Sequence, residues 1–494
     1  KTKPVQAYRL LAPRELPNKT RPLSGRRAAL IGRQREMAVL ARAMARLQEG
    51  QGSNIAIGGE AGTGKSRLLE EFRATLDLKA VKWMEGHAYA YTQNISYYPL
   101  INMIKRELAF GKGDTPGKVA ARLDAYLEGL VSSPENVAPY IGGLLSLQYP
   151  EVAKMSPEFW KSRLHHAILT TLDAQAKQAP LVICFEDLQW ADPTFLNFLR
   201  LLVAKPKFGI IFLYTYRPPF KLFGDEAIAK MGETYQEIRL QELSPGEIQE
   251  MLASLLQTAA VPEDLKRFVQ EKVETNPFYL EEMINSLTES GMLQCEAGNW
   301  RLTGNLDEAD IPSNIQSVIL GRIDRLEDAA KSLLQEASVF GRTVPYEPLK
   351  NISRHAGNLD GLLERLEAFD LLRSTSQEQQ NYVFKHAMIQ DVVYNSLLKK
   401  DRQAMHRRIG LWIERMLGSR LPEFYEVLAF HFRHSDLSQK DLSQKAVHYL
   451  RESGRKSLQQ YAVQESNQYY QRAFQILNQN LHGSEEEKSV IIGF

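Results

Sequence analysis

The sequence predicts a doubly wound α/β domain followed by a long region that is almost entirely helical. Short apolar runs at 54–59, 181–185 and 208–218 alternate with segments of helical periodicity, which is typical of a covered parallel sheet. Beyond residue 244 the apolar positions recur at helical spacing nearly to the end. A chain of 494 residues is too long for one hydrophobic core, so we expect three or four domains.

The composition is that of an ordinary folded protein and excludes several classes. Hydrophobic residues make up 44% of the chain and charged residues 24%, without the bias of disordered or collagen-like proteins. The formal net charge of +2 argues against a general affinity for nucleic acid. No apolar run approaches the ~20 residues of a membrane-spanning helix, and no signal peptide is evident. Cys184 and Cys295 cannot form a disulfide framework, so we expect a cytoplasmic protein.

The first elements lead from a linker into the α/β domain. Residues 1–27 are basic and rich in proline, which predicts a linker. Apolar positions recur at helical spacing over 31–48, and the strand at 54–59 follows. Residues 80–88 are expected to form a second strand.

Residues 98–178 are predicted to be mostly helical and to end in one long helix. Ser156 as N-cap and Pro157 at the first helical position mark its start. The predicted buried stripe of this helix consists of Phe159, Trp160, Leu164, Ile168 and Leu172.

The second half of the chain shows three further signals. Ser244 and Glu247 form the pattern of a capping box at a helix start. Residues 292–304 read as a small hairpin. Residues 444–478 read as paired amphipathic helices that cannot bury their apolar faces alone, which predicts repeats of the tetratricopeptide (TPR) kind continuing beyond the sequence. Because the sequence begins with Lys1 and not Met, we expect a piece of a longer polypeptide.

Residues 59–66, GEAGTGKS, match the phosphate-loop pattern G-x-x-x-x-G-K-[ST] between a predicted strand and a predicted helix. Glycines allow the backbone to turn successive N–H groups toward an anion, and the helix N-terminus adds partial positive charge. A chance glycine-rich turn is the alternative, but the strand before and the helix after it favour a phosphate loop. Lys65 can reach the β- and γ-phosphates, and Ser66 can ligate Mg²⁺. The predicted loop residues that bind ATP or ADP are Gly59, Gly62, Thr63, Gly64, Lys65, Ser66 and Arg67.

Two acids, Glu186 and Asp187, follow the apolar run 181–185 at the edge where open α/β sheets bind ligands. One carboxylate can hold the water shell of the metal, and the other can orient or deprotonate the attacking water. Adjacent acids after a strand are also common at helix starts, so this prediction depends on Lys65. We assign Glu186 to Mg²⁺ and Asp187 to the water, but the opposite order stays open because a strand-end Asp usually takes the metal side.

Arg217 follows the next apolar run, in the segment YTYRPP. Its place at the carboxyl end of a strand would let it contact the γ-phosphate, so we predict a catalytic role for it beside Lys65 and Asp187. A surface arginine next to a Pro-Pro turn is the alternative.

Five segments carry a family resemblance: IGRQREM, GGEAGTGKSRLLEEF, FEDLQWADPT, TYRPP and ETNPFYLEEM. They resemble, in this order, the motifs of STAND-class ATPases, which are signalling ATPases related to the AAA+ machines. The closer resemblance is to the ATPase region that follows the catalytic domain in class III adenylyl cyclases of the soluble type. The segment 5–13, VQAYRLLAP, resembles the end of such a cyclase domain. The same module is also found in large ATP-dependent transcriptional activators and beside some serine/threonine kinase domains.

The resemblance implies further nucleotide contacts. Arg33 would lie near the adenine or ribose, and Pro277 would pack on the base. His386, in FKHA, would contact the β-phosphate from a winged-helix domain. A plain helix-starting proline and a histidine at a domain seam are the respective alternatives. The family often has Gly where this chain has Thr275, which leaves the geometry of that turn open.

The resemblance also implies a domain order. It consists of a linker (1–27), a P-loop nucleotide-binding domain (28–225), a helical lid (226–305), a winged-helix domain (306–405) and the start of TPR-like repeats (406–494). Winged helices often bind DNA, and residues 399–408 are basic, but these charges lie on an amphipathic helix without interleaved aromatic residues. We therefore expect a lid over the nucleotide and no nucleic-acid partner.

The predicted function is an ATP-binding, slowly hydrolysing switch that controls an attached signalling domain, for which the resemblance points to an adenylyl cyclase. Expected partners are the upstream domain of the same polypeptide, a protein bound to the helical repeats and, through nucleotide-dependent assembly, further copies of the chain. The alternatives are a scaffold that holds ADP permanently and a transcriptional activator. A free-standing catalytic cyclase is excluded because residues 1–28 are too few for such a domain.

Overall fold

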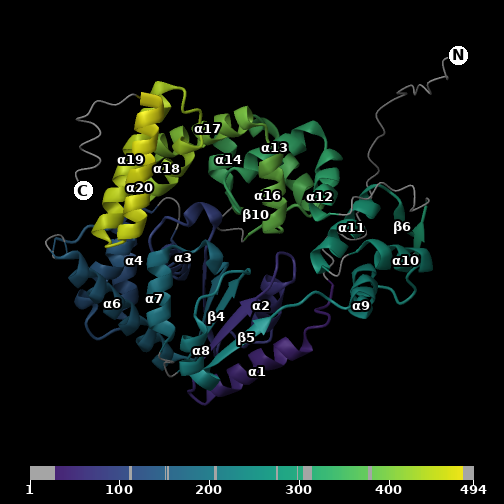
Figure 1. Cartoon of the computed structure of the whole chain (residues 1–494), viewed down its shortest axis with the longest axis horizontal. Helices are drawn as coiled ribbons and strands as arrows, with labels where there is room; N and C mark the ends of the chain where they lie inside the picture. Colours follow the sequence, from purple (N-terminus) through teal and green to yellow (C-terminus); the bar gives the residue numbers. More distant parts are fainter. Residues whose placement is uncertain are drawn as a thin grey trace.

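The structure is a computed structural model in which an α/β domain lies below an arch of helices (Figure 1). It describes residues 28–481 except 111–113, 151, 153–154, 205–208, 274–275, 297–298, 304–313 and 376–380. The predicted linker 1–27, the cyclase-like segment 5–13, Thr275 and the last residues of the predicted repeats therefore lie outside the described residues.

The α/β domain is built on one sheet of five strands in the order β2-β3-β4-β1-β5. Every neighbouring pair in it is parallel. The strands are β1 (Ser53–Gly58), β2 (Lys82–His87), β3 (Leu181–Glu186), β4 (Ile210–Tyr216) and β5 (Tyr235–Arg239). All residues of β1 and β4 are buried, as are all but the last of β3. These strands are apolar because helices cover both faces of the sheet, which confirms the predicted parallel α/β fold.

The sequence analysis did not predict the edge strand β5. The predicted end of this domain, residue 225, falls before β5, which pairs with β1 at the edge of the sheet. In β5 only Ile238 is buried, so the strand lacks the continuous apolar run that revealed the others. An edge strand with few buried side chains gives little hydrophobic signal in a sequence.

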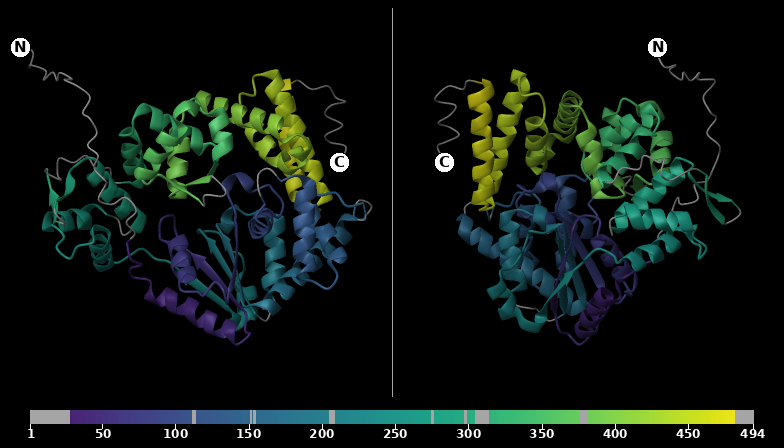
Figure 2. Two further views of the ribbon diagram at one scale, coloured as in Figure 1. Left: turned by 180° about the vertical axis from the view of Figure 1, so that it is seen from behind. Right: turned by 45° about the vertical axis from the view of Figure 1, so that its right-hand side comes forward.

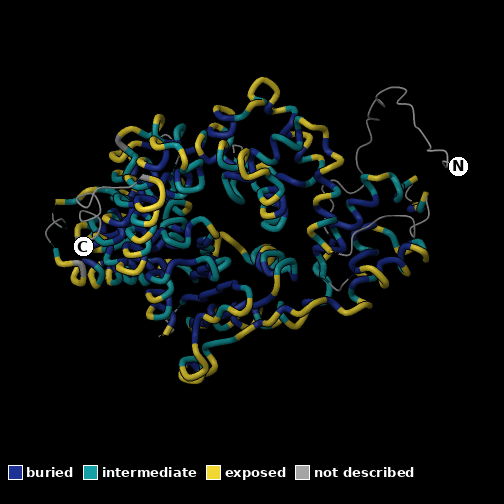
Figure 3. The backbone as a smooth tube through the Cα atoms, turned by 45° about the horizontal axis from the view of Figure 1, so that its top comes forward, coloured by how far each residue is buried: buried dark blue, intermediate teal, exposed yellow. Residues whose placement is uncertain are grey.

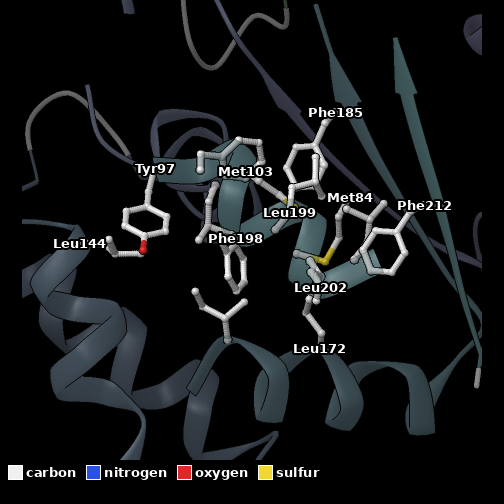
Figure 4. Close-up of a cluster of buried hydrophobic side chains, with 14 of the residues drawn as sticks. Met84, Tyr97, Met103, Leu144, Leu172, Phe185, Phe198, Leu199, Leu202 and Phe212 are labelled. Atoms are coloured by element: carbon white, nitrogen blue, oxygen red, sulfur yellow. The ribbon is translucent and has the colours of Figure 1, made fainter. Parts of the chain in front are cut away.

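Two hydrophobic cores sandwich the sheet. On one face, α1 (Gln34–Gln48) and α2 (Lys65–Ala74) pack on β1. On the other face the core includes Phe185 and Phe212 of the sheet together with Leu199 and Leu202 (Figure 4). Its helices are α3 (Tyr98–Glu107), α4 (Pro116–Glu128), α5 (Ala138–Leu144), α6 (Pro157–Gln178), α7 (Pro193–Val203) and α8 (Asp225–Met231).

The long helix α6 begins as predicted, with the Ser156 side chain accepting a hydrogen bond from the Phe159 N–H. Four of the five residues predicted to form the buried stripe are buried. The prediction is wrong for Phe159, which has 47% of its surface exposed. Phe159 sits in the first turn, where the Arg163 guanidinium lies over its ring at 5.1 Å. Helical spacing in the sequence shows which face of a helix is apolar, but not which turns of that face are covered by neighbouring helices.

The unit predicted to be a lid, called the lid below, has a core of its own. It comprises α9 (Pro245–Leu256), α10 (Glu263–Lys272), α11 (Pro277–Glu289), β6 (Leu293–Glu296) and β7 (Asn299–Leu302). Ser244 and Glu247 form the predicted capping box at the start of α9. The predicted hairpin is present as the antiparallel pair β6–β7.

The next unit combines helices with a three-stranded antiparallel sheet in the order β8-β10-β9. Its elements are α12 (Ile315–Asp324), α13 (Asp328–Ser338), β8 (Thr343–Pro345), α14 (Tyr346–Ile352), α15 (Leu359–Ala368), β9 (Leu372–Ser374), β10 (Asn381–Phe384) and α16 (Ala387–Ser396). Arg322 of α12 is buried and pairs with Glu282 and Glu289 of α11, which ties this unit to the lid. The winged-helix assignment of this unit stays a prediction.

The last unit is helical and returns to the α/β domain. It contains α17 (Lys399–Leu417), α18 (Tyr425–Arg433), α19 (Lys440–Gln459) and α20 (Val463–Ile476). The helices α19 and α20, yellow in Figure 2, lie side by side and end against the helices of the α/β domain. They form the predicted helix pair, whereas their likeness to TPR repeats stays a prediction.

Buried residues line the sheet and the inner faces of the helices, and exposed residues follow the outer surface (Figure 3). No helix in the described part of the chain combines the length and apolar character that crossing a bilayer requires.

Candidate nucleotide-binding site

The glycine loop joins the carboxyl end of β1 to the N-terminus of α2. Gly62 and Gly64 have φ angles of +85° and +96°, in the left-handed region that favours glycine. A Cβ at Gly62 would lie 2.6 Å from Oδ1 of Asn276, so this position also requires glycine for space. The loop is thus bare backbone at the edge of the sheet where the predicted site lies.

Lys65 is buried beneath this loop. Its Nζ donates to the carbonyl oxygens of Gly59 at 2.6 Å and Glu60 at 2.7 Å. Burial is the largest cause that lowers the pKa of Lys65 to about 8, and the negative charge of Asp187 opposes it. The ammonium group is therefore mostly charged at neutral pH but held only by loop carbonyls, so an added anion would stabilise its charge.

Ser66 and Glu186 meet directly, although 120 residues separate them in the chain. The Ser66 hydroxyl donates to Oε2 of Glu186 at 2.7 Å, and Oε1 of the same carboxylate lies 3.6 Å from Nδ1 of His87. The two predicted Mg²⁺ ligands are thus brought together. No group of three or more His, Cys, Asp or Glu side chains suited to a metal occurs in the described residues.

Asp187 lies beside Arg217 on the neighbouring strand end. Asp187 has a φ of +60°, and its N–H donates to Oγ1 of Thr215 at 2.9 Å. Its Oδ1 accepts from Gln189 at 3.1 Å and lies 4.0 Å from Nε of Arg217. That Nε is buried without a hydrogen-bond partner among the described residues. The left-handed backbone of a non-glycine residue here is a local strain of the kind found at functional sites.

The start of α11 touches the loop from the lid. Asn276 caps this helix by accepting from the Phe278 N–H at 3.0 Å, and its Nδ2 donates to the carbonyl of Ala61 at 3.0 Å. Pro277 opens the helix and lines the same cavity as the loop. Asn276 was not predicted from the sequence, where it reads only as a helix cap before proline.

His386 reaches the cavity from the start of α16. Its ring stacks on Phe278 with the ring centres 3.9 Å apart. Its Nδ1 accepts from the Met388 N–H at 3.2 Å, so in the neutral ring the proton is on Nε2. Burial, followed by the charges of Arg342, Arg217, Lys65 and Lys385, lowers the pKa of His386 to about 3. The ring is therefore a neutral N–H donor at physiological pH.

Arg33 and Arg67 are held by backbone carbonyls at the far side of the loop. Arg33 is buried and donates to the carbonyls of Thr63 at 3.2 Å and Gln241 at 2.6 Å. Arg67 donates to the carbonyl of Ala28 at 3.0 Å. Both side chains line the cavity, and their bonds place them as supports of the loop and of the chain entering the domain.

Most of the predicted site residues line one cavity of about 210 Å³, whereas Gly59 and Glu186 are not among the described residues of its lining. Three basic residues of its wall, Arg342, Arg373 and Lys385, come from the unit above the α/β domain and were missed in the sequence. Lys385 pairs with Asp370 at 2.5 Å, whereas Nε of Arg342 is buried without a hydrogen-bond partner in the described structure. The sequence analysis gave neither Arg342 nor Arg373 a role in the site, because they reach it only through the folding of a distant unit.

Comparison with known proteins agrees with this geometry. Residues 29–213 match the family model described as the AAA ATPase domain. An uncharacterized protein of Rhizobium meliloti (strain 1021) is 25% identical over 464 residues, which cover 91% of this chain and 43% of the relative. The chain thus spans less than half the length of this relative.

Several solved structures resemble the chain at low similarity. The Cdc6p protein of Pyrobaculum aerophilum is 11% identical with a TM-score of 0.35, covering 76% of this chain and 98% of that one. The Drosophila ORC structure bound to DNA contains a chain that is 14% identical with a TM-score of 0.34. The similarity covers 80% of this chain and 96% of that one. The Aeropyrum pernix ORC1 protein in complex with DNA is 13% identical with a TM-score of 0.31, and the similarity covers 77% of this chain and 97% of that one. The match of residues 29–213 to the AAA ATPase domain agrees with the parallel sheet and the phosphate loop found there.

Proposed function

We propose that the chain is an ATP-binding and slowly hydrolysing regulatory module whose lid and upper unit close over the nucleotide. One observation carries this proposal: three separate parts of the chain line a single cavity. They are the phosphate loop, the start of α11, and the segment around Arg342 and His386. A ligand in such a cavity interacts with all three parts, so its charge can change how they are held together.

The residues present fit a nucleotide with Mg²⁺. The loop amides and Lys65 would bind the β- and γ-phosphates, and Arg217 and Arg342 would each offer a buried nitrogen that lacks a partner in the described structure. Ser66 and Glu186 would hold Mg²⁺, which neutralises developing negative charge on the phosphates when bound. The single bond between Ser66 and Glu186 would then give way to a shared metal site.

Asp187 would orient the attacking water and accept its proton. Its carboxylate accepts one hydrogen bond from Gln189 and faces Arg217 across 4.0 Å, so it has room for a further partner. Phosphoryl transfer needs positioning and charge neutralisation more than covalent chemistry. The sequence identifies no arginine finger, so we expect slow hydrolysis.

His386 would report nucleotide binding to the upper unit. As a neutral donor stacked on Phe278, it can donate from Nε2 to a phosphate oxygen without a change in its protonation. We assign the module to the STAND class and expect it to control an attached signalling domain, most simply an adenylyl cyclase. The matched relative is more than twice as long as the segment it shares with this chain, which leaves room for further domains.

Two variants distinguish this switch from a scaffold that holds ADP permanently. Lys65→Ala should lower ATP affinity by more than about 100-fold, measured by calorimetry, because it removes a buried charge from the phosphate site. The exposed Lys79→Ala is the matched control. Asp187→Asn should keep ATP binding and abolish hydrolysis.

Unaltered ATP binding by Lys65→Ala would contradict the proposal. If Asp187→Asn leaves signalling output untouched while Lys65→Ala unfolds the protein, the scaffold is the better account. A transcriptional activator, the other alternative, would require a DNA-binding module outside this sequence.

A further inference from the structure

A second, larger cavity lies beside the nucleotide cavity. Its volume is about 700 Å³, within the range of about 300 to 1,000 Å³ that small-molecule sites occupy. One wall comes from the α/β domain, through the 3₁₀ turn Ala90–Thr92 and helix α3. The opposite wall comes from residues 338–345 and from helices α17 and α18. The cavity therefore exists only where the α/β domain and the upper units face each other.

Aromatic rings form much of its lining. Tyr89 and Tyr91 stack with ring centres 5.5 Å apart and planes 3° apart, and Tyr98 meets both edge-on. Across the seam, the ring of Phe430 lies 6.1 Å from that of Tyr91. Trp412 lines the same cavity from α17. A planar aromatic molecule can stack on such rings at both walls.

Several cations of the lining lie near acidic side chains, and Arg217 is one of them, with its Nε 4.0 Å from Oδ1 of Asp187. Lys105 lies 3.9 Å from Glu423, and Lys456 pairs with Glu426 at 3.0 Å. Nε of Arg342 is buried without a hydrogen-bond partner among the described residues. Arg342 lines this cavity and the nucleotide cavity alike. An anionic group would therefore find its counter-charge at the boundary between the two.

The aromatic wall also leads to the catalytic acids. Tyr89 stacks on His87 with ring centres 6.1 Å apart, and His87 lies 3.6 Å from a carboxylate oxygen of Glu186. A ligand in the larger cavity can thus affect the nucleotide site in two ways. It can act through Arg342, and it can act through the stacked rings of Tyr89 and His87. Nothing in the AAA ATPase match accounts for the cavity, whose upper wall lies beyond residue 213.

We propose that this cavity binds a planar aromatic small molecule that carries a carboxylate or sulfonate group. Its rings stack between Tyr91 and Trp412, and its anion pairs with Arg342. Because a nucleotide phosphate would use the same guanidinium, this ligand weakens nucleotide binding. The coupling depends on the proposed function, but ligand binding itself does not.

The test uses 8-anilinonaphthalene-1-sulfonate, a fluorescent aromatic sulfonate, with the whole chain and no nucleotide. We expect one saturable site per chain, measured by calorimetry and by dye fluorescence. Val427→Trp fills the cavity and should lower dye affinity at least tenfold. Val463→Trp, at a position with 50% of its surface exposed on α20, is the matched control and should bind the dye normally.

Two further measurements keep the test decisive if Val427→Trp fails to fold. Arg342→Gln should weaken the dye at least tenfold, whereas the exposed Arg354→Gln should not. Energy transfer from tryptophan to the dye should fall more in Trp412→Phe than in Trp300→Phe, because Trp300 belongs to the lid hairpin. Absence of saturable binding, or equal effects of the test and control variants, would overturn the site.

Nucleotide coupling is measured last. Saturating ADP should weaken dye binding several-fold, and the dye should weaken ADP binding by the same factor. If the dye binds with the same affinity with and without bound ADP, the coupling is refuted but the proposed site is not. A failure of ADP to bind at all would instead refute the proposed function.

Discussion

Two interfaces between the α/β domain and the rest of the molecule differ in how their polar groups are paired. We call them the nucleotide seam, around the nucleotide cavity, and the second seam, between α20 and α7. At the nucleotide seam, cations from both sides face a cavity, and Arg217 and Arg342 each carry a buried nitrogen without a hydrogen-bond partner in the described structure. At the second seam, α20 packs on the first turn of α7. There Glu465 is fully buried, and its carboxylate accepts from the N–H of Thr194 at 3.0 Å and from its hydroxyl at 2.9 Å.

The difference shows which seam can respond to a ligand. Because Nε of Arg217 and Nε of Arg342 lack hydrogen-bond partners among the described residues, an anion bound between them would add bonds that hold the nucleotide seam together. The α20 seam has its hydrogen bonds made within the chain, so it is held without a ligand. We therefore expect nucleotide exchange to loosen the first seam, while the second acts as an anchor.

The largest effect is expected when both arginines of the nucleotide seam are replaced. The double variant Arg217→Ala, Arg342→Ala should weaken ADP binding by about 100-fold or more, because each charge-assisted hydrogen bond contributes about 1.5–3 kcal/mol. Calorimetry would measure the affinity, and Arg354→Ala would be the exposed control. An affinity within threefold of the parent would show that these nitrogens do not face the phosphates.

Breaking the α20 seam should affect stability and leave ADP binding intact. Glu465→Ala leaves the N–H and the hydroxyl of Thr194 buried without their partner, at a cost of about 1–3 kcal/mol in the free energy of unfolding. Hydrogen exchange should rise in α19 and α20. The exposed neighbour Gln464→Ala should change neither quantity. A large loss of ADP affinity in Glu465→Ala would contradict the division into two seams.

The same anchor should depend on pH through Asp192. Burial, followed by the nearby charge of Glu465, raises the pKa of Asp192 to about 8, and backbone hydrogen bonds such as that from Phe195 oppose the shift. The folded state then binds more protons than the unfolded state between about pH 4 and pH 8, so the free energy of unfolding falls as pH rises through this window. Asp192→Asn, which can still cap α7, should flatten this dependence in thermal melts between pH 5 and pH 8. An unchanged slope would show that Asp192 is ionised throughout.

The smallest effect should come from the lid. Asn276→Ala removes the bond to the Ala61 carbonyl and the cap of α11, so we expect ADP affinity to fall a few-fold and the melting temperature to fall slightly. Asn314→Ala, which caps α12 without touching the loop, is the matched control for the loss of a cap. Equal ADP affinities in the two variants would mean that the lid contact plays no part in binding.

The predicted site residues differ in how well the sequence marked them. Ser66 and Glu186 lie in separate motifs, and their contact follows from the rule that parallel strands meet ligands at their carboxyl ends. Arg33 was expected near the base; it lines the nucleotide cavity and donates from one guanidinium nitrogen to the carbonyls of Thr63 and Gln241, and its contact with the base stays a prediction. The spacing of residues indicates that an arginine is near the loop, but not which of its neighbours it binds.

The sequence alone determined the parallel sheet, the phosphate loop and the acids opposite it, because hydrophobic periodicity and local motifs depend on neighbours in the chain. Only the tertiary structure decided that Arg342 lines the cavity at the phosphate loop, that Glu465 is buried on α7, and that an aromatic cavity lies between the α/β domain and the upper units. These contacts join residues far apart in the chain, and they depend on how whole units pack, which no local pattern records.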